Sequence, residues 1–460
     1  MRFHRHAFPS SSFSSVIVIP AKAGIHEHGR TPGLASAFMG PRLRGGDENW
    51  RSAGMAPHVS GALSWQAYSG GPMPPLIFEP CDLPDEAEAL RGKVRAFLAE
   101  ELADYPVSKR AHSWIGFDGE FSRNLGARGW LGMTWPAPWG PGRSALERYV
   151  VIEELLAAGA PVAAHWIAER QSGPLLLRFG NDEQRALCLP GIIAGETYFC
   201  IGMSEPDSGS DLASIRSKAV RAEVKGEAGW VVTGRKVWTT YAQNSHYMIA
   251  LLRTGDAGES RHDGTTQFLI DLSLPGVEVR PIRNLLGDEE FNEVTFDEVF
   301  VPEAMMIGAE GEGWRQVTAE LAFERSGPDR FLSAYALLAE LVRFVSALPS
   351  DATAGAHDAI GRLYAHLTSL RALSISVATR LDAGEEPALE ASVVKDLGVT
   401  FEQSIPEIAQ QILGIAPRLD GGSDFEASLA YVQQACVSFS LRGGTTEIMR
   451  GVIARGLGLR

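Results

Sequence analysis

The sequence predicts an α+β fold in which a helical N-terminal domain, a middle β domain and a C-terminal helical bundle follow one another. Apolar residues recur at helical spacing from Leu83 to about Gly195, the period shortens to that of strands from Tyr198 to about Pro302, and the helical period returns after Gly313. Because strands and helices do not alternate along the whole chain, a doubly wound α/β fold is excluded. A length of 460 residues, 45% of them hydrophobic, suits these domains, which we place at residues 76–197, 198–303 and 304–460.

Residues 1–75 precede these domains, and their first part differs from the rest in composition. Residues 1–54 carry a formal charge of +4, whereas the remaining residues carry −18. The segment VIPAKAGIH (Val18–His26) followed by MGPRLRGGD (Met39–Asp47) resembles a translated bacterial repeat element. We expect a mis-annotated or disordered extension, with Met55 or Met73 as the true start, and a targeting sequence is the remaining alternative.

The helical and strand-like elements follow in order. The first helix has apolar residues at i, i+4, i+7 and i+8, namely Leu90, Val94, Phe97, Leu98 and Leu102. Another apolar stretch with interleaved acidic residues covers Tyr149–Ala158. The middle domain has four β-rich runs separated by turn residues, which are Trp230–Thr240, Tyr247–Arg253, Gln267–Leu272 and Glu293–Val301.

The C-terminal domain is predicted to consist of long helices that pack antiparallel. They cover Trp314–Ser326, Arg330–Val345, His357–Ala383, Leu389–Leu413, Phe425–Leu441 and Thr445–Leu457. Pro406 interrupts the fourth of these helices, and Ser404 and Glu407 have the spacing of a capping box. We therefore expect a kink or a restart of the helix there.

Composition and motif spacing exclude several classes of function. The net charge of −14 argues against nucleic acid or an anionic membrane surface as a partner, and no apolar run reaches the roughly 18 residues of a membrane-spanning helix. The four cysteines lie far apart without CxxC spacing, which favours a reducing compartment such as the bacterial cytoplasm. HExxH, GxGxxG and GxxxxGK[ST] are missing, so metal catalysis and the common nucleotide loops are not indicated.

Three segments have the residue types of a ligand site. GMSEPDSGSDL (Gly202–Leu212) combines small residues, carboxylates and hydroxyls, but Ser204 lacks the GxSxG pattern of a hydrolase nucleophile. In VVTGRKVWTTYA (Val231–Ala242) the period of two places Trp238 and Thr240 on one strand face, where a half-buried structural role and a ligand contact are both open. In LRGGTTEIMR (Leu441–Arg450) a glycine pair leads into a helix that Thr445 can cap.

Together and in this order, six segments resemble the acyl-CoA dehydrogenase family over about residues 80–460. They are Glu153–Pro161, Phe179–Glu196, Gly202–Ser214, Thr233–Thr240, Phe296–Gly308 and Gly443–Arg455. The resemblance implies a helical N-terminal domain, a middle β-barrel-like domain and a C-terminal four-helix bundle, with FAD between the β domain and the bundle. It also implies oxidation of an acyl-CoA thioester to the trans-2-enoyl-CoA, with the hydride passing to the flavin.

The resemblance further implies which residues contact FAD. At the flavin itself they are Met203 and Ser204 at the pyrimidine edge, Trp238 and Thr240 at the isoalloxazine ring, and Ser210 near the pyrophosphate. From the C-terminal bundle they are Thr445 and Glu447, together with Gln411 and Gly414, which would reach the FAD of a neighbouring subunit. A stacking indole and a nearby hydroxyl suit a planar flavin.

The resemblance also implies a base that removes the α-proton, but the chain departs from the family pattern at the usual position of that base. Many members carry Glu directly before the Gly-Thr of the C-terminal motif, whereas this chain has Gly443 there. A second family position for the base, on the first bundle helix, is matched by Glu324, which is followed by Arg325 as an expected substrate contact. Apolar neighbours along that helix would raise the pKa of the carboxyl group, as a general base requires. Glu320 and Asp329 are the alternative carboxylates.

A second departure leaves the assembly open. The Arg-Lys-x-Phe-Gly segment by which many relatives hold FAD across a dimer is replaced by FVSALPSDATAG (Phe344–Gly355). The resemblance implies a homodimer or homotetramer that passes electrons to an electron-transfer flavoprotein, and the altered segment makes a heterotetramer credible. Two alternative functions remain: a flavin oxidase or monooxygenase on the same fold, and a non-catalytic partner subunit of a heteromeric acyl-CoA dehydrogenase.

Overall fold

The computed structural model describes residues 76–460 except 257, 350–354, 420–421 and 460, and it describes residues 319–324 by their backbone alone. The prediction for residues 1–75 lies outside the described residues. Among the residues that are described, no helix is long and apolar enough to cross a membrane.

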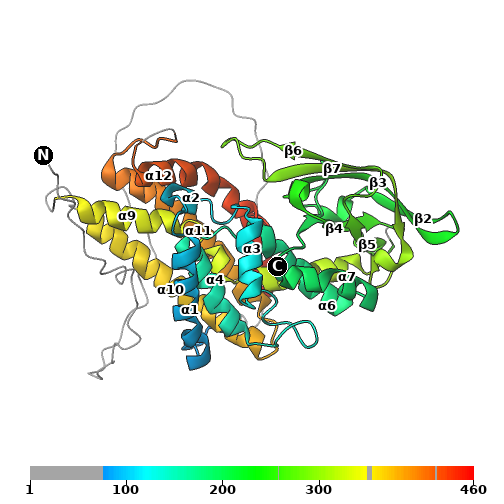
Figure 1. The fold of residues 1–460 in the computed structure, drawn as a ribbon, viewed down its shortest axis with the longest axis horizontal. Coiled ribbons are helices and arrows are strands. Elements are labelled where there is room, and N and C mark those ends of the chain that lie inside the picture. The colour runs from blue at the N-terminus through cyan, green and yellow to red at the C-terminus, as the bar shows by residue number, and fades with distance from the viewer. Residues whose placement is uncertain (1–75, 257, 350–354, 420–421, 460) are drawn as a thin grey trace, which may run out of the picture. The chain divides into compact units, whose positions relative to one another are not determined.

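Helices form the first part of the described chain (Figure 1). They are α1 (Asp85–Glu101), α2 (Val107–Arg110), α3 (Gly119–Ala127), α4 (Ala145–Ala158), α5 (Ala163–Ile167), the π-helical turn η1 (Ala168–Ser172), α6 (Gly173–Phe179) and α7 (Asp182–Ile193). The apolar residues predicted to face the core from the first helix are all buried, and α1 packs against α4. A complete capping box formed by Ser144 and Glu147 starts α4, and Gly159 ends it in the left-handed conformation.

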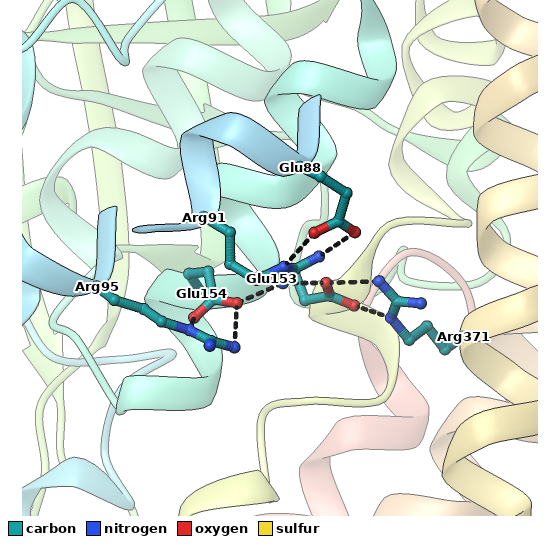
Figure 2. A network of polar contacts seen from close by, with 6 residues as sticks. All are labelled: Glu88, Arg91, Arg95, Glu153, Glu154 and Arg371. Atoms are coloured by element: carbon teal, nitrogen blue, oxygen red, sulfur yellow. Dashed lines mark hydrogen bonds and ion pairs between the residues drawn. The ribbon is translucent and has the colours of Figure 1, made fainter. Parts of the chain in front are cut away.

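A network of ion pairs fastens α1 and α4 to the C-terminal helix α10 (Figure 2). Glu153 and Glu154 on α4 are more than nine-tenths buried. The Arg91 guanidinium lies 2.9 Å from Glu153, and that of Arg371 on α10 binds the same carboxylate at 2.5 Å and 3.1 Å. Arg95 forms two hydrogen bonds with Glu154. Each buried carboxylate has a guanidinium partner, which offsets the cost of removing its charge from water. The ion pairs therefore hold α1 and α4 against α10.

One mixed sheet forms the middle of the chain. Its strands are β1 (Phe199–Gly202), β2 (Lys218–Val224), β3 (Glu227–Thr240), β4 (Tyr247–Arg253), β5 (Thr265–Asp271), β6 (Val277–Ile282), β7 (Phe291–Pro302) and β8 (Met306–Ile307). The strand order is β6-β7-β3-β2-β4-β5-β8, and β1 pairs with β4 in parallel. The four predicted runs correspond to β3, β4, β5 and β7, whereas β1, β2, β6 and β8 were not predicted as strands. The long strands β3 and β7 pair antiparallel, and the register shifts between Lys236 and Thr239.

The helical bundle follows the sheet. Its helices are α8 (Gly313–Glu324), α9 (Tyr335–Ala347), α10 (Ala356–Asp382), α11 (Ala388–Leu413), α12 (Asp424–Ala435) and α13 (Thr446–Gly456). The turns η5 (Pro328–Arg330) and η7 (Cys436–Leu441) are 3₁₀-helical, so the helices predicted to begin at Arg330 and to end at Leu441 are shorter than expected. The predicted fold class, α+β with helices on either side of a β domain, is confirmed.

Of the kink or restart predicted at Pro406, the restart is wrong, and the kink stays a prediction. Helix α11 runs without interruption from Ala388 to Leu413, and Pro406 is fully inside it. The Ser404 hydroxyl does not cap a new helix, because it donates to the carbonyl oxygen of Phe401 at 2.7 Å. A proline lacks the N–H that would bond the carbonyl one turn earlier, and Pro406 is buried within the helix in spite of that loss.

Candidate active site

A buried ion pair holds the loop after β1 against β3. The Lys236 side chain is completely buried, and its Nζ donates to the backbone oxygen of Met203 at 3.1 Å and to Glu205 at 2.8 Å. Glu205 also accepts hydrogen bonds from the backbone N–H groups of Arg216 and Ser217. Burial lowers the pKa of Lys236 to about 8, while Lys236 and the two N–H donors hold the pKa of Glu205 below its usual value in spite of burial.

This pair brings three of the predicted flavin contacts together. Met203 and Ser204 lie at the start of the loop, and the Ser204 carbonyl accepts a hydrogen bond of 2.9 Å from the N–H of Val237, the residue before Trp238. The Trp238 side chain is 59% exposed and meets Phe291 edge-on, with 6.1 Å between ring centroids. The described residues form no hydrogen bond with the hydroxyl of Ser204. Ser210 lies farther along the same loop and is exposed.

A β-bulge interrupts the regular strand at Trp238, so the face that it shares with Thr240 stays a prediction. The backbone of Trp238 has φ +59°, in the left-handed region, and it sits at the register shift between Lys236 and Thr239. Side chains therefore do not alternate strictly between the two faces of the sheet at Trp238. Thr240 is half-buried and pairs with Phe291 across the strands. The bulge, rather than strand alternation, is what projects the indole from the sheet.

Helix α8 packs against the same loop. Val317 is buried with Ile215 and Leu251, and Met203 packs against this cluster. The α8 backbone continues for two turns beyond Val317 and ends at Glu324. The side chains of Glu324 and Glu320 lie outside the described residues, so the predicted base is placed here only by its backbone. Arg325 follows as the half-buried C-terminal cap of the helix.

The alternative base Asp329 is held in a buried network of ion pairs. It is 5% exposed, pairs with Arg170 and lies 3.2 Å from the guanidinium of Arg330. These guanidinium groups hold its pKa below the usual value although burial acts in the opposite direction. A carboxylate that is stabilised in its charged form by two cations is a poor acceptor for a substrate proton.

The C-terminal motif is fixed by a second buried ion pair that sequence reasoning missed. The guanidinium of Arg442 lies 3.1 Å from Glu402 on α11 and donates to the Ser333 hydroxyl at 3.1 Å, while the N–H of Ser333 donates to Glu402 at 2.6 Å. Arg442 also lies 4.7 Å from the centroid of the Trp114 ring. Burial lowers the pKa of Arg442 to about 10 and raises that of Glu402. The signal in the sequence is an acidic residue, Glu402, on the apolar face of α11.

The glycine pair makes the turn that Arg442 anchors. Gly443 has φ +63° and Gly444 has φ +98°, a backbone region that disfavours residues with side chains. The Thr445 hydroxyl then caps α13 by accepting a hydrogen bond of 3.4 Å from the N–H of Ile448, as predicted from the sequence. Glu447 lies exposed in the first turn of α13, where hydrogen bonds from its own backbone N–H and from the Thr445 side chain lower its pKa.

Gln411 and Gly414 lie away from the other predicted contacts. Lys395 in the first half of α11 donates to the carbonyl of Gly444, whereas Gln411 lies about 24 Å farther along the same helix at 1.5 Å per residue. Gln411 is exposed and donates to Glu407 at 3.0 Å, and Gly414 ends α11 with φ +60°. Within one chain, Gln411 and Gly414 therefore do not lie beside Thr445 and Glu447.

Comparisons with known proteins agree with the arrangement of the chain. Residues 84–196, 200–299 and 311–458 match the models of the N-terminal, middle and C-terminal domains of acyl-CoA dehydrogenase. The chain is 33% identical over 397 residues to acyl-CoA dehydrogenase IpdE1 of Mycolicibacterium smegmatis, a match that covers 81% of this chain and 98% of that one. It is 35% identical over 376 residues to acyl-CoA dehydrogenase FadE34 of Mycobacterium tuberculosis. That match covers 81% of this chain but only 49% of FadE34, so the chain spans about half the length of that relative.

Among solved structures, the chain is similar to the ChsE4-ChsE5 complex from Mycobacterium tuberculosis. The TM-score is 0.71 and the sequence identity 27%, and the match covers 83% of this chain and 98% of that one. The chain matches three consecutive domains of one family, and it covers nearly the whole length of a relative in that family. The chain belongs to the acyl-CoA dehydrogenase family, whose members are flavin-dependent oxidoreductases that act on CH–CH bonds.

Proposed function

We propose that this chain catalyses the FAD-dependent α,β-dehydrogenation of an acyl-CoA thioester to the trans-2-enoyl-CoA, with Glu324 as the base for the α-proton. The observation that carries the proposal is the packing of α8 against the loop of Met203. The helix that ends at Glu324 thereby adjoins the segment expected to contact the flavin. Proton removal and hydride transfer at neighbouring carbons require such proximity.

The residues around Trp238 fit a planar cofactor with hydrogen-bonding edges. The exposed indole offers a stacking surface, and the hydroxyls of Ser204 and Thr240 have no hydrogen-bond partner among the described residues. Met203, Ser204, Ser210, Trp238 and Thr240 would hold FAD from the β domain, and Thr445 and Glu447 from α13. FAD would supply the hydride acceptor for the β-carbon.

The geometry of the C-terminal turn supports Glu324 over the more common position of the base. A glutamate at Gly443 would have to adopt φ +63°, which is costly for a residue with a side chain. Asp329 is committed to its guanidinium partners. We therefore assign the role of general base for the α-proton to Glu324. Arg325, the next residue, is assigned to binding the substrate.

The assignment is tested by replacing Glu324 with Gln. The variant is expected to retain FAD, but anaerobic bleaching of the oxidised flavin band by a reactive acyl-CoA should slow by at least about a hundredfold, because a positioned general base contributes on that scale. Glu320→Gln, one turn earlier on the same helix, is the matched control. Bleaching at the wild-type rate in Glu324→Gln, or its selective loss in Glu320→Gln, would refute the role given to Glu324.

We further propose a homodimer or homotetramer in which Gln411 and Gly414 reach the FAD of the neighbouring subunit, with an electron-transfer flavoprotein as the acceptor. Gln411 lies far along α11 from Lys395, which contacts Gly444 beside Thr445. This separation supports a contact of Gln411 and Gly414 with the FAD of the neighbouring subunit. The measurement is FAD affinity and oligomeric mass of Gln411→Ala. A weaker affinity in the intact oligomer is expected, and an unchanged affinity would contradict the contact.

A second candidate function is a partner subunit in a heteromeric acyl-CoA dehydrogenase. It is favoured by Gly443, which cannot act as a base, and by the similarity to one chain of the ChsE4-ChsE5 complex. A homogeneous homo-oligomer that contains no flavin would support this function, whereas one FAD per chain would oppose it. Rapid peroxide formation with substrate in air would instead indicate an oxidase.

A further inference from the structure

A partly open cavity lies beside the turn that follows α8. It has a volume of about 100 Å³ and is lined mainly by α4, by α5 with the π-helical turn η1, by residues 326–329 and by the end of α10. Most of its wall is apolar, with Trp114, Leu131, Ile152 and Leu156 among the lining residues. The cavity is therefore suited to part of a largely hydrocarbon ligand.

The cavity lies close to the proposed site of proton removal. Ser326, which lines it, is two residues beyond Glu324, and two virtual bonds of about 3.8 Å limit the distance between their Cα atoms to about 8 Å. An acyl group whose α-carbon is held near Glu324 needs to extend only a short way to enter the cavity. The far end of the chain, rather than the thioester, would occupy it.

The charged groups in the cavity wall already have partners. Arg148 binds Glu169 through Nε at 2.8 Å and through a second nitrogen at 2.5 Å. Arg170 pairs with Asp329 and lies over the ring of Trp166 at 4.4 Å. These pairs leave no net charge that would call for an ionic ligand.

Two polar nitrogen atoms in the same wall have no hydrogen-bond partner among the residues that the structure describes. His165 is 3% exposed, and among the described residues none hydrogen-bonds its Nδ1. The indole Nε1 of Trp166 is likewise buried and unbonded by the described residues. Burial, assisted by the neighbouring Arg148 and opposed by Glu169, lowers the pKa of His165 to about 4, so the ring is neutral at pH 7. A buried polar group without a hydrogen bond is costly, and a ligand can remove that cost.

We propose that this cavity receives the far end of the acyl group and that His165 selects acyl chains carrying a carbonyl or hydroxyl oxygen there. The inference rests on the proposed dehydrogenation and names the class of its substrate. A carbonyl oxygen would accept hydrogen bonds from the Trp166 indole and from the Nδ1–H of His165, and a hydroxyl could instead donate to an unprotonated Nδ1, whereas a hydrocarbon end would leave both groups unsatisfied. The surrounding tryptophan and leucine side chains cover the carbon skeleton.

The experiment compares straight-chain acyl-CoAs with oxo-acyl-CoAs of equal length that carry a ketone next to the terminal carbon. Anaerobic flavin bleaching should give the wild-type enzyme a kcat/KM about tenfold higher for the oxo-acyl member of the best pair. His165→Leu should lose that preference, with little change for the straight chain. His357→Leu, exposed in the first turn of α10, is the matched control and should keep the preference. A loss of kcat/KM that is equal for both substrates in His165→Leu would overturn the proposal.

A binding measurement separates this inference from the proposed reaction. The rise in Tm caused by each acyl-CoA is recorded for the wild type and for His165→Leu without any turnover. A larger rise with the oxo-acyl-CoA that disappears in the variant supports the role of His165 even if no acyl-CoA bleaches the flavin, a result that would refute dehydrogenation alone. A marked fall in the ligand-free Tm of His165→Leu would show that a bound water satisfies the histidine, and this would overturn the proposal.

Discussion

Trp238 combines two features that the fold itself does not require. A bulky residue at φ +59° is a strained conformation, and an indole that is 59% exposed gains little from burial. Strain and exposure together cost stability, so a ligand contact accounts for the residue better than packing does. The bulge in β3 that causes both features also lies beside the backbone of Ser204.

Removing the indole should weaken flavin binding and leave the apoprotein intact. For Trp238→Ala we expect the Kd for FAD to rise about tenfold, because a stacking partner is lost, whereas Trp238→Phe should keep most of the affinity. The free energy of unfolding of the apoprotein should change by no more than about 0.5 kcal/mol, as for other exposed sites. Fluorescence titration and urea unfolding measure the two quantities.

The control for Trp238 is Leu285→Ala, a substitution at a side chain that is 85% exposed. It should alter neither FAD affinity nor stability. Equal affinity in Trp238→Ala and the wild type would show that the indole does not contact the cofactor. A large loss of stability in Trp238→Ala would assign the side chain to packing.

At the scale of single elements, the ion pair of Lys236 and Glu205 fixes the loop after β1. The loop has little secondary structure of its own, and Glu205 holds it by accepting from Lys236 and from the N–H groups of Arg216 and Ser217. Lys236 in turn binds the Met203 carbonyl. One buried pair therefore sets the position of the first two predicted flavin contacts relative to β3.

Breaking this pair should be costly. Lys236→Met leaves Glu205 buried without a cation, and we expect the free energy of unfolding to fall by about 3 kcal/mol, while Lys236→Met combined with Glu205→Gln should recover part of that loss. Arg235→Met is the matched control, because Arg235 is exposed and its ion pair with Glu293 spans 3.4 Å. A urea denaturation series in which Lys236→Met is no less stable than Arg235→Met would contradict the argument.

The helices of the bundle, the first helix and four of the strands could be predicted from periodicity, and two of the strands that were missed have physical reasons. The strand β6 contains Pro281 and no buried residue, and β2 has a single buried side chain, so neither presents the apolar alternation by which strands are recognised. Pro406 is a local signal against helix that the tertiary packing of α11 overrides. The bulge at Trp238 depends on pairing with β7, a contact distant in sequence, and single-strand alternation does not reveal it.

At the scale of the whole molecule, Trp114 joins segments that are far apart in the sequence. The guanidinium groups of Arg170, Arg330 and Arg442 lie 5.3 Å, 5.9 Å and 4.7 Å from its ring. They come from the N-terminal helices, from the turn after α8 and from the turn before α13. These arginines form one cluster on the aromatic face of Trp114, in which Asp329 and Glu402 offset two of their three positive charges.

This convergence marks the limit of what the sequence could predict. The loop after β1, β3 and the glycine turn were identified from their composition and order, because ligand contacts require particular residue types at those points. The partners that hold them, such as Lys236 for Met203 and Glu402 for Arg442, are set by contacts between elements distant in sequence. His165 carries no motif at all, and its importance rests on burial beside a cavity.

The buried histidine also predicts how the stability of the protein depends on pH. His165 has a pKa of about 4 in the folded state against a usual value of 6.5, so below pH 6.5 the unfolded chain binds a proton that the folded chain does not. Folding stability is thus fully present above pH 6.5 and falls as the pH drops towards 4. The contribution of His165 to this loss is about 3 kcal/mol, since each pKa unit corresponds to about 1.4 kcal/mol.

His165→Leu isolates that contribution. Urea unfolding curves measured at intervals from pH 7 to pH 4.5 should show the wild type losing stability more steeply than the variant, with the two differing least in slope above pH 6.5. His112, whose pKa burial also lowers to about 4, remains in both proteins and cancels in the comparison. Parallel curves across this range would mean that the pKa of His165 is the same in the folded and the unfolded chain, which would contradict the effect of burial.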